Sequence, residues 1–422
     1  MTNFSRRELL QLGLAAGCSA FASNPAVWGV TRKREVLPVA AVVTEYTPNS
    51  HADVIVGKIL TGYRQDGGRG PDLKLVSLYA DQFPAKDLSR KLAEQHGFRI
   101  ARSIDEALTH GTNQIQVAGV LSIGEHGQYA LTADTKQQMY PRRRFFDDIV
   151  ATFQRVGKTI PVFNDKHLGY RWDDALFMVE TARAMQFALL AGSSLPVAWR
   201  LPVLDLPIDC EIESALAIGY GGLEAYGFHA IEALQCMLER RKGSETGVTR
   251  VQAVSGDEIR HAESDGRWSQ ELFAAVLKTF PGSPNDSNSW TQNENSAGYL
   301  LNHQDGLKSA VLMANGLVGQ FGVAVKLKSR ADPLATWFKL QEGVPYAHFG
   351  YLVRAIEHTL HTGYAAYPVE RTLLTTGILD RLMQSLAQEG KQIETPELNV
   401  TYRPVDWPFA NHPDQTLILP YE

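Results

Sequence analysis

Apolar runs alternate with helical patterns through the first part of the chain, and this alternation constrains the fold most strongly. The runs are Leu37–Thr44, Leu73–Ala80, Val117–Ile123 and Ile160–Phe163. Continuous apolar runs of this length suit strands that are buried on both faces of a parallel sheet. Because segments with helical spacing separate them, the sequence predicts an α/β fold with a doubly wound parallel sheet.

The helices that accompany these strands are predicted from apolar residues spaced three and four positions apart. They cover Ala52–Gln65, Ala85–Gln95, Ile104–His110, Arg143–Val156 and a long segment, Asp173–Leu190. Ser103 followed by Glu106 forms a capping-box pattern before the third of them. Together with the strands, they predict a Rossmann-like domain over residues 36–195.

The pattern changes after residue 195, and at 422 residues the chain is long enough for two domains. Short strand-like runs now predominate, with three helical patterns among them. The predicted strands are Ala198–Val203, Val248–Ser255, Gly298–Asn302, Ser309–Ala314, Gly319–Lys326 and Leu398–Pro404, and the helices are Leu223–Arg240, Tyr346–Leu360 and Val369–Gln388. This mixture of short strand-like runs and helical patterns predicts an α+β domain over residues 196–422 with an open, mainly antiparallel sheet.

Charge and cysteine content narrow the partners of the chain. The net charge is −5, so no general positive field attracts nucleic acid. The one basic run, Arg142–Arg144, opens a helical pattern and is predicted to be a solvated helix face. Cys210 and Cys236 lie in apolar settings, which favours buried free thiols over a disulfide framework.

Residues 1–24 are predicted to be a twin-arginine signal peptide. Ser5–Leu10 (SRRELL) carries the arginine pair, and the apolar run Leu12–Ala22 is shorter than the roughly 20 residues of a spanning helix. An exported, periplasmic protein without a stable membrane span follows from this interpretation. Lipid anchoring at Cys18 is an alternative. The twin-arginine route carries folded proteins, commonly loaded with a cofactor.

Polar side chains follow three of the predicted strands directly. Since the carboxyl ends of parallel strands share one edge of the sheet, these side chains are expected to meet in a crevice there. The residues concerned are Glu45, His51, Glu125, His126, Asp165 and His167. Imidazole and carboxylate groups are also the ligands of divalent metals, so a metal site is one alternative for this crevice.

Two further residues could transfer protons. Lys166 lies between Asp165 and His167, and an ammonium group in a cleft can donate a hydrogen bond or a proton. His229 precedes Glu232 by three positions, which places both on one face of a helix. Imidazole suits proton transfer near neutral pH.

Several features together resemble the glucose–fructose oxidoreductase/inositol dehydrogenase family. The order of the elements is similar, and so are six short segments spread over roughly residues 36–402. These segments are Ser103–His110, Val162–Lys166, Gly227–Glu232, Thr362-Gly363, Pro368–Thr372 and Thr395-Pro396. The resemblance implies a nucleotide-binding fold followed by a domain that holds the substrate.

This resemblance also implies an activity: hydride transfer between NAD(P) and a sugar or polyol, in an enzyme that forms homo-oligomers. Lys166 would bind the reacting hydroxyl, His229 would remove its proton, and Glu232 would orient His229 or line the pocket. Asp165 and His167 would bind the substrate. The residues expected to bind the cofactor are Tyr46, Asn49, Ser50, Asp81, Glu125 and His126.

The sequence departs from the family at the phosphate-binding loop. Glu45–His51 contains no glycine, whereas the family carries Gly-x-Gly-x-x-Gly/Ala there, which brings the pyrophosphate close to backbone N–H groups. Two other functions therefore stay open. One is a cofactor-independent or metal-assisted lyase, hydrolase or epimerase acting on a carbohydrate. The other is a carbohydrate-binding protein without catalytic activity.

Overall fold

The computed structural model describes residues 35–282 and 289–411. The predicted signal peptide over residues 1–24, including Cys18, lies outside the described residues. The chain divides into the units Met1–Glu35 and Val36–Glu422, and the second unit contains both sheets. Among the described helices, none combines the length and the apolar character needed to cross a membrane.

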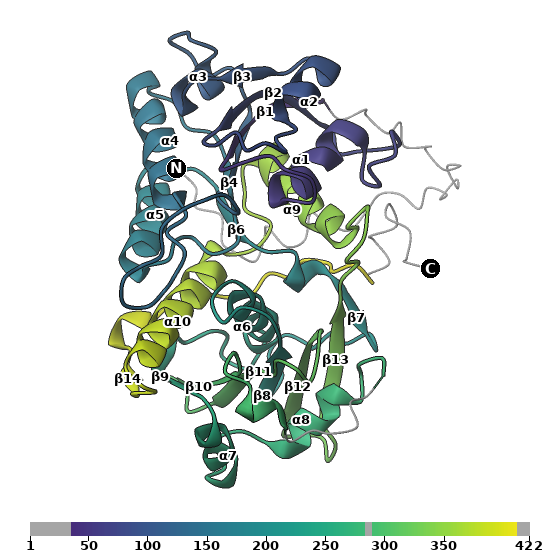
Figure 1. The fold of residues 1–422 in the computed structure, drawn as a ribbon, viewed down its shortest axis with the longest axis vertical. Coiled ribbons are helices and arrows are strands. Elements are labelled where there is room, and N and C mark those ends of the chain that lie inside the picture. Colours follow the sequence, from purple (N-terminus) through teal and green to yellow (C-terminus); the bar gives the residue numbers. More distant parts are fainter. Residues whose placement is uncertain (1–34, 283–288, 412–422) are drawn as a thin grey trace, which may run out of the picture. The chain divides into compact units, whose positions relative to one another are not determined.

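The first sheet is six-stranded and parallel throughout, with the order β3-β2-β1-β4-β5-β6 (Figure 1). Its strands are β1 (Leu37–Val43), β2 (Leu73–Ala80), β3 (Arg99–Ala101), β4 (Gly119–Ile123), β5 (Val162–Asp165) and β6 (Leu189–Gly192). The order reverses direction between β1 and β4. At such a switch point the carboxyl ends of the strands leave a crevice in which ligands bind.

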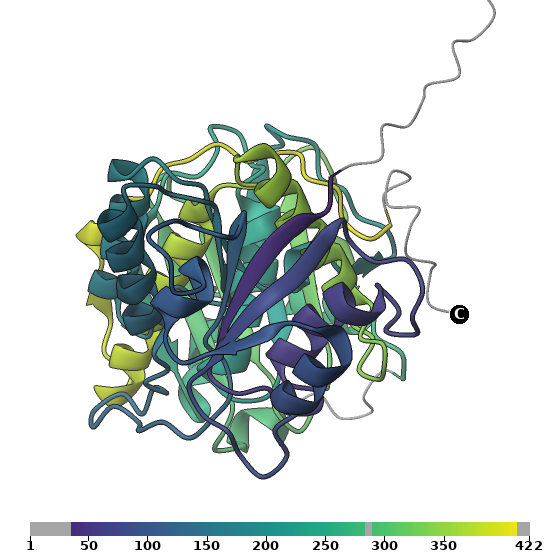
Figure 2. The same ribbon diagram turned by 90° about the horizontal axis from the view of Figure 1, so that it is seen from above.

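Helices cover both faces of the first sheet (Figure 2). One face carries α3 (Ile104–Thr109), α4 (Arg142–Val156) and α5 (Trp172–Ala184); the other carries α1 (His51–Thr61), α2 (Ser89–His96) and α9 (His348–Thr362). Alternate residues of β1 serve the two layers: Ala40 and Val42 pack on the first face, Val39 and Ala41 on the second. The late segment α9 therefore completes the layer that begins with α1.

The second sheet has eight strands in the order β14-β9-β10-β11-β8-β12-β13-β7, and only β8 and β11 pair in parallel. Its strands are β7 (Trp199–Leu201), β8 (Ile212–Gly219), β9 (Val248–Val254), β10 (Ala297–His303), β11 (Lys308–Met313), β12 (Phe321–Leu327), β13 (Leu334–Lys339) and β14 (Ile393–Glu394). The predicted α/β architecture with an additional, mainly antiparallel sheet is confirmed.

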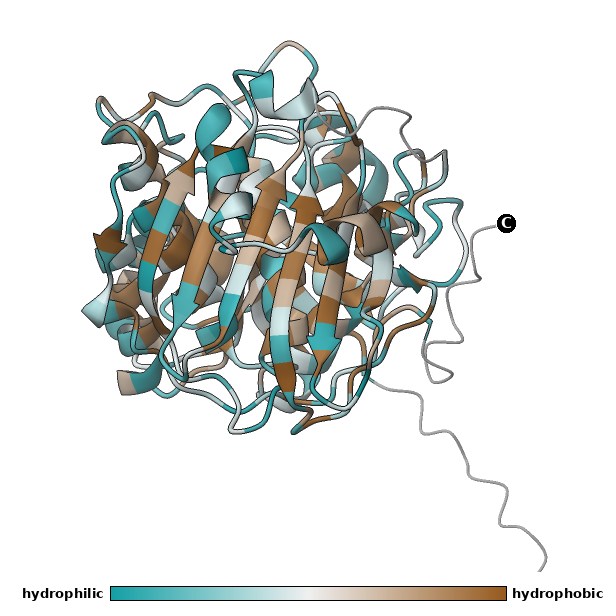
Figure 3. Cartoon of the chain, turned by 90° about the horizontal axis from the view of Figure 1, so that it is seen from below, coloured by the Kyte–Doolittle hydropathy of each residue, from teal (hydrophilic) through white to brown (hydrophobic). Residues whose placement is uncertain are grey.

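Helices lie on both faces of the second sheet. The face toward the first sheet carries α6 (Ala225–Leu238) and α10 (Val369–Ala387), and the lower face, seen in Figure 3, carries α7 (Asp257–Ser264) and α8 (Gln270–Leu277). Three short 3₁₀ helices complete the described elements: η2 (Leu195–Val197), η3 (Ser289–Gln292) and η4 (Pro396–Leu398). Helix α10 contacts α5 and β6 as well as α6 and β9, so it joins the two sheets.

Two predicted elements are wrong. The long helix over Asp173–Leu190 ends at Ala184, and Leu189–Gly192 forms β6, which pairs with β5. A continuous apolar run is compatible with either structure, and here the neighbouring strand decides. Leu398–Pro404 is not a strand; apart from the end of η4, only Tyr402 makes an isolated bridge, to Glu245.

Apart from β6 and the 3₁₀ helices, six elements have no predicted counterpart: β3, β8, β13, β14, α7 and α8. The other predicted strands and helices match observed ones, with ends that shift by up to a few residues. Cys210 and Cys236 are both free thiols, as predicted; Cys236 is buried as expected, whereas Cys210 is half-buried.

Candidate active site

A cavity of about 450 Å³ lies at the carboxyl edge of the first sheet. Its lining from that sheet includes Asn49 and His51 after β1, Glu125 and His126 after β4, and Lys166 after β5. From the second half of the chain, His229 on α6 lines the same cavity. The strand tips and α6 therefore bring an amine and several imidazoles to one pocket.

Lys166 belongs to a buried charge network. Its Nζ donates a 2.8 Å hydrogen bond to Oε1 of Glu125, and Arg142 donates to the other carboxylate oxygen of Glu125. Burial alone would raise the pKa of Glu125, but the charges of Lys166 and Arg142 outweigh it and hold that pKa well below its ordinary value. One carboxylate therefore serves two cations, and the cluster carries one net positive charge beside the cavity.

The backbone at Lys166 is unusual for a residue with a side chain. Its φ is 60°, in the left-handed region, and its N–H donates to the carbonyl of Gly192 on β6. Strained residues of this kind persist only where the surroundings hold them. The turn directs the amine that follows β5 toward Glu125.

Arg142 corrects the prediction of a solvated basic face over Arg142–Arg144. Its side chain is 0% exposed and is paired with Glu125. A second guanidinium nitrogen lies 3.1 Å from Nε2 of His167. Burial, and then the charge of Arg142, hold the pKa of His167 well below its ordinary value, so the imidazole is neutral. His167 supports the network from behind and does not line the cavity.

His51 and Asp165 form a second pair at the sheet edge. Nδ1 of His51 lies 2.6 Å from Oδ2 of Asp165, whose side chain is fully buried. The backbone N–H of His51 donates to Nδ1 of His126 over 3.5 Å. Burial, and then the nearby charge of His51, lower the pKa of His126 to about 4. Asp165 thus contacts His51 and lies outside the cavity lining.

His229 is held by Ser193 and Glu232. Nδ1 of His229 lies 3.0 Å from the Ser193 hydroxyl, and that hydroxyl donates to the Glu232 carboxylate. Since the hydroxyl proton goes to Glu232, the Ser193 oxygen is free to accept the Nδ1 proton, which leaves Nε2 as the basic nitrogen. Burial, and then the charge of Lys166, hold the pKa of His229 well below its ordinary value. Glu232 orients the imidazole and does not line the cavity.

Glu232 gives the protein a specific pH dependence. Burial raises its pKa from 4.5 to about 7, so between these values the folded protein binds a proton that the unfolded chain releases. We therefore expect this residue to lower the free energy of unfolding by about 3 kcal/mol as pH rises from 4.5 to 7. Urea unfolding of wild type and Glu232→Gln across this range measures the difference. A difference that stays constant with pH would contradict the assignment.

The position where this fold binds the pyrophosphate of a dinucleotide is closed by the protein's own groups. Ser50 caps α1 and accepts N–H bonds from Thr47 and Asp53, and the carboxylate of Asp53 accepts the N–H of Asn49 at 2.9 Å. The N–H of His51 is directed to His126. An anion at this helix end would lose these donors and would meet the Asp53 carboxylate.

The ribose-binding position is also occupied. Oδ1 of Asp81 accepts the hydroxyl of Tyr79 at 2.9 Å, and Oδ2 accepts both Tyr129 and Arg144 at 2.7 Å. Tyr46 is fully buried in the apolar layer between the first sheet and α1. Of the residues expected to bind a dinucleotide, Asn49, Glu125 and His126 line the cavity, whereas Tyr46, Ser50 and Asp81 do not. The residues present do not fit the phosphate half of NAD(P).

The metal alternative has no support in the part of the chain that the structure describes. Within residues 35–282 and 289–411, no three His, Cys, Asp or Glu side chains are arranged to hold an ion. Glu45 accepts the hydroxyl of Thr47 and does not join His51 and His126 in the cavity.

The aromatic wall of the cavity is not predicted from the sequence. It is formed by Tyr220, Tyr226, Phe321, Tyr346, His348 and Phe349. These residues come from β12, α6, α9 and the loops beside them, and they line the same cavity as the polar strand tips. Their signal in the sequence is weak, because aromatic residues at such positions are equally typical of a core.

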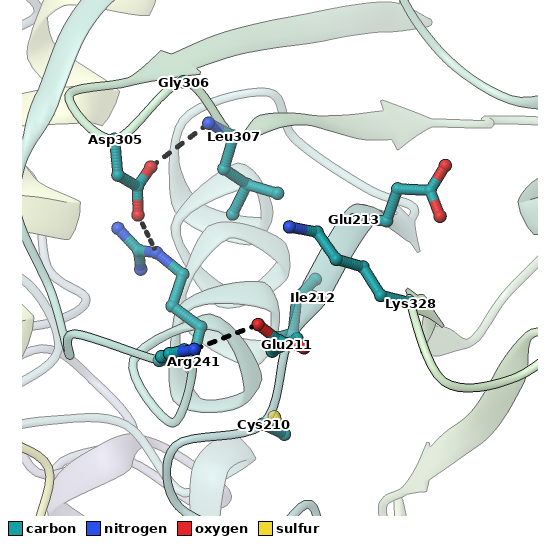
Figure 4. A pocket seen from close by; sticks show the side chains of 10 residues that line it. Cys210, Glu211, Ile212, Glu213, Arg241, Asp305, Gly306, Leu307 and Lys328 are labelled. Atoms are coloured by element: carbon teal, nitrogen blue, oxygen red, sulfur yellow. Dashed lines mark hydrogen bonds and ion pairs between the residues drawn. The ribbon is translucent and has the colours of Figure 1, made fainter.

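A second hollow, of about 300 Å³, lies near the C-terminal end of α6 (Figure 4). Its ionic groups are largely satisfied by one another: Asp305 pairs with Arg241 at 2.6 Å, and Glu211 pairs with Lys242 at 3.1 Å. None of the described residues that line it is a histidine. We therefore place the candidate active site in the first cavity.

No family model matches the chain, and no curated protein matches it either. Solved structures do. GenD2 from gentamicin A biosynthesis, in complex with NAD, aligns at 14% identity with a TM-score of 0.55, over 86% of this chain and 97% of that one. The scyllo-inositol dehydrogenase of Lactobacillus casei aligns at 9% identity with a TM-score of 0.53, over 85% of this chain and 98% of that one.

An oxidoreductase from Agrobacterium radiobacter, in complex with NAD⁺, L-tartaric acid and magnesium, aligns at 13% identity with a TM-score of 0.52, over 85% of this chain and 98% of that one. The chain shares the fold of the inositol dehydrogenases and related oxidoreductases. The resemblance read from the sequence is thus confirmed at the level of fold, which is as far as such low identities reach.

Proposed function

We propose that the protein is an oxidoreductase-like enzyme that acts on a sugar or polyol bound in the cavity at the edge of the first sheet. One observation carries this proposal: Lys166 and His229, which come from opposite halves of the chain, line the same cavity. The exported location predicted from residues 1–24 belongs to the same proposal. The fold supports it, because its solved relatives include dehydrogenases of inositols.

The chain's own residues would act on one hydroxyl group of the substrate. The Lys166 ammonium would donate a hydrogen bond to the hydroxyl oxygen and stabilise it as its proton leaves. His229 would accept that proton at Nε2, since Ser193 holds Nδ1. The aromatic wall, including Tyr226 and Phe321, would pack against the apolar face of the ring.

In a dehydrogenase a nicotinamide accepts the hydride from the carbon that bears this hydroxyl. We derive no such step for this chain, because the positions that hold the pyrophosphate and the ribose are occupied by Asp53, His126 and the partners of Asp81. The dehydrogenase function therefore rests on the fold.

The occupied positions at the first turn of α1 and at Asp81 favour a second candidate function. An epimerase or lyase on this fold would need proton transfer at the substrate and no exchangeable dinucleotide. The closed first turn of α1 is compatible with such an enzyme, and the imidazoles of His51, His126 and His229 supply the acid and base groups.

Calorimetric titration of the purified protein separates these functions. We expect myo-inositol or another polyol to bind, and a dissociation constant weaker than about 1 mM for both NAD⁺ and NADP⁺ would favour the epimerase or lyase. Micromolar binding of a dinucleotide would contradict the conclusion that these residues do not fit NAD(P), and it would support the dehydrogenase function. If no sugar or polyol in a broad panel bound, the proposed function would be wrong. Binding without turnover of any panel member would instead indicate the non-catalytic binding protein.

A further inference from the structure

The His51–Asp165 pair has no part in the hydroxyl chemistry assigned to Lys166 and His229, although it lies at the same cavity. Asp165 ends β5, and His51 begins α1, 114 positions away along the chain. Asp165 is fully buried, whereas the side chain of His51 is 13% exposed and lines the cavity. The pair thus consists of a buried acid behind an accessible imidazole.

The contact determines which imidazole nitrogen is available. Asp165 accepts the proton of Nδ1 at 2.6 Å, so the lone pair of the ring lies on Nε2. A buried carboxylate behind an imidazole also stabilises the imidazolium that forms when the ring takes a proton. The other oxygen of Asp165 has no hydrogen-bond partner among the described residues, so His51 is the one side chain there that bonds this carboxylate.

Charges around the cavity are divided into two groups. Lys166, Arg142 and Glu125 together carry one net positive charge, and Asp165 behind His51 carries one negative charge. The net positive charge beside Lys166 can stabilise a substrate oxygen that becomes negative. The carboxylate of Asp165 can stabilise the His51 ring when it becomes positive. A reaction that separates a proton from its electron pair needs both.

We propose that His51, positioned by Asp165, is the general base that removes a proton from a carbon next to the carbonyl group of a keto sugar or keto polyol. This inference rests on the proposed function, since it requires such a substrate in the cavity. His51 would thus remove a proton from carbon, whereas His229 would remove one from a hydroxyl group.

The step is balanced without an oxidant. The carbon–hydrogen bond breaks, its proton goes to Nε2 of His51, and its electron pair forms the carbon–carbon double bond of an enolate. The former carbonyl oxygen takes the negative charge and is stabilised by the Lys166 ammonium. Return of a proton to the same carbon completes an exchange or an epimerisation, and no hydride leaves the substrate.

Proton exchange in D₂O tests this step directly. The probe is the 2-keto derivative of myo-inositol, a polyol ring with one ketone, and ¹H NMR follows loss of the signals next to the carbonyl. We expect wild type to exchange these protons well above the buffer rate, and His51→Asn to lower the catalysed rate about 100-fold or more. Asparagine keeps a donor toward Asp165 and removes the base. If this variant does not fold, His51→Gln takes its place.

Asp165→Asn tests the positioning role. We expect a fall of at least tenfold in kcat for exchange with little change in KM, because the substrate contacts remain while the tautomer of His51 is no longer fixed. A merely structural role would alter the two constants together. His261→Asn, an exposed histidine on α7, is the matched control and should leave exchange unchanged.

Calorimetry with the same keto-inositol distinguishes a failure of the inference about His51 from a failure of the proposed function. If it binds and wild type exchanges only at the buffer rate, or if His51→Asn exchanges as fast as wild type, the inference about His51 is wrong while the proposed function stands. If it does not bind and no polyol binds, both fail. Binding with exchange that depends on His51 supports both.

Discussion

Replacing Lys166 by methionine is expected to lower kcat/KM about 10³-fold for whichever sugar or polyol the enzyme turns over. Among the residues that line the cavity in the described part of the chain, Lys166 is the one lysine or arginine. Methionine keeps much of the side-chain volume and removes the charge that stabilises the substrate oxygen. Loss of one such charged donor in a water-poor site costs about 4 kcal/mol of transition-state stabilisation, which corresponds to this factor. Steady-state kinetics measure it.

The matched control is Lys158→Met. Lys158 is exposed and follows the end of α4, away from the cavity lining. We expect this variant to retain wild-type activity. Urea unfolding of Lys166→Met should accompany the kinetics, because the Glu125 carboxylate keeps only Arg142 as its cation. A folded Lys166→Met protein with activity within threefold of wild type would refute the role of this amine.

Arg142→Met is expected to lower the free energy of unfolding by about 3–5 kcal/mol. Arg142 is fully buried and donates to Glu125, and a second guanidinium nitrogen lies 3.1 Å from His167. Its removal leaves a carboxylate inside the protein with Lys166 as its one charged partner. Chemical denaturation at neutral pH measures the loss.

The neighbouring residue Arg143 provides the control for this variant. It is also paired, with Asp147 and Asp174, but its side chain is 31% exposed and lies over the ring of Phe177. Because solvent screens these pairs, we expect Arg143→Met to cost no more than about 1 kcal/mol. Equal losses for the two arginines would contradict the conclusion that the buried Arg142–Glu125 pair costs more to break than the exposed pairs of Arg143.

Much of the polar half of the candidate site follows from the sequence. Glu125, His126, His51 and Lys166 each come shortly after an apolar run, and the carboxyl ends of parallel strands must share one edge. A topological rule therefore brought together residues that are far apart in the chain. His229 is different: the resemblance of Gly227–Glu232 to a known family, not its spacing, predicts its place at the same cavity.

Other features could not be predicted because they depend on tertiary partners. The basic run Arg142–Arg144 looks solvated until the carboxylate of Glu125 is seen beside Arg142. Leu189–Gly192 continues an apolar helical pattern until β5 provides a neighbour for it. The sequence predicts that Asp81 is available to a ribose, and only the fold shows that Tyr129 and Arg144 already bond its carboxylate.

The first turn of α1 shows both what the sequence predicts and what only the structure adds. The absence of glycine from Glu45–His51 was visible in the sequence, and it predicts a poorer fit to a pyrophosphate. The structure adds the cause: Ser50, Asp53 and His126 already use the N–H groups at this helix end. At this helix end the chain's own side chains thus already bond the N–H groups that a pyrophosphate would need.

The most direct test of the account is a crystal structure of the protein with the keto-inositol or another polyol that binds in calorimetry. We predict that the ligand lies in the cavity with one oxygen within about 2.7–3.2 Å of Nζ of Lys166 and with His229 in contact with the same ring. A ligand bound instead in the hollow beside Arg241 and Asp305, or one that touches only one of Lys166 and His229, would contradict it.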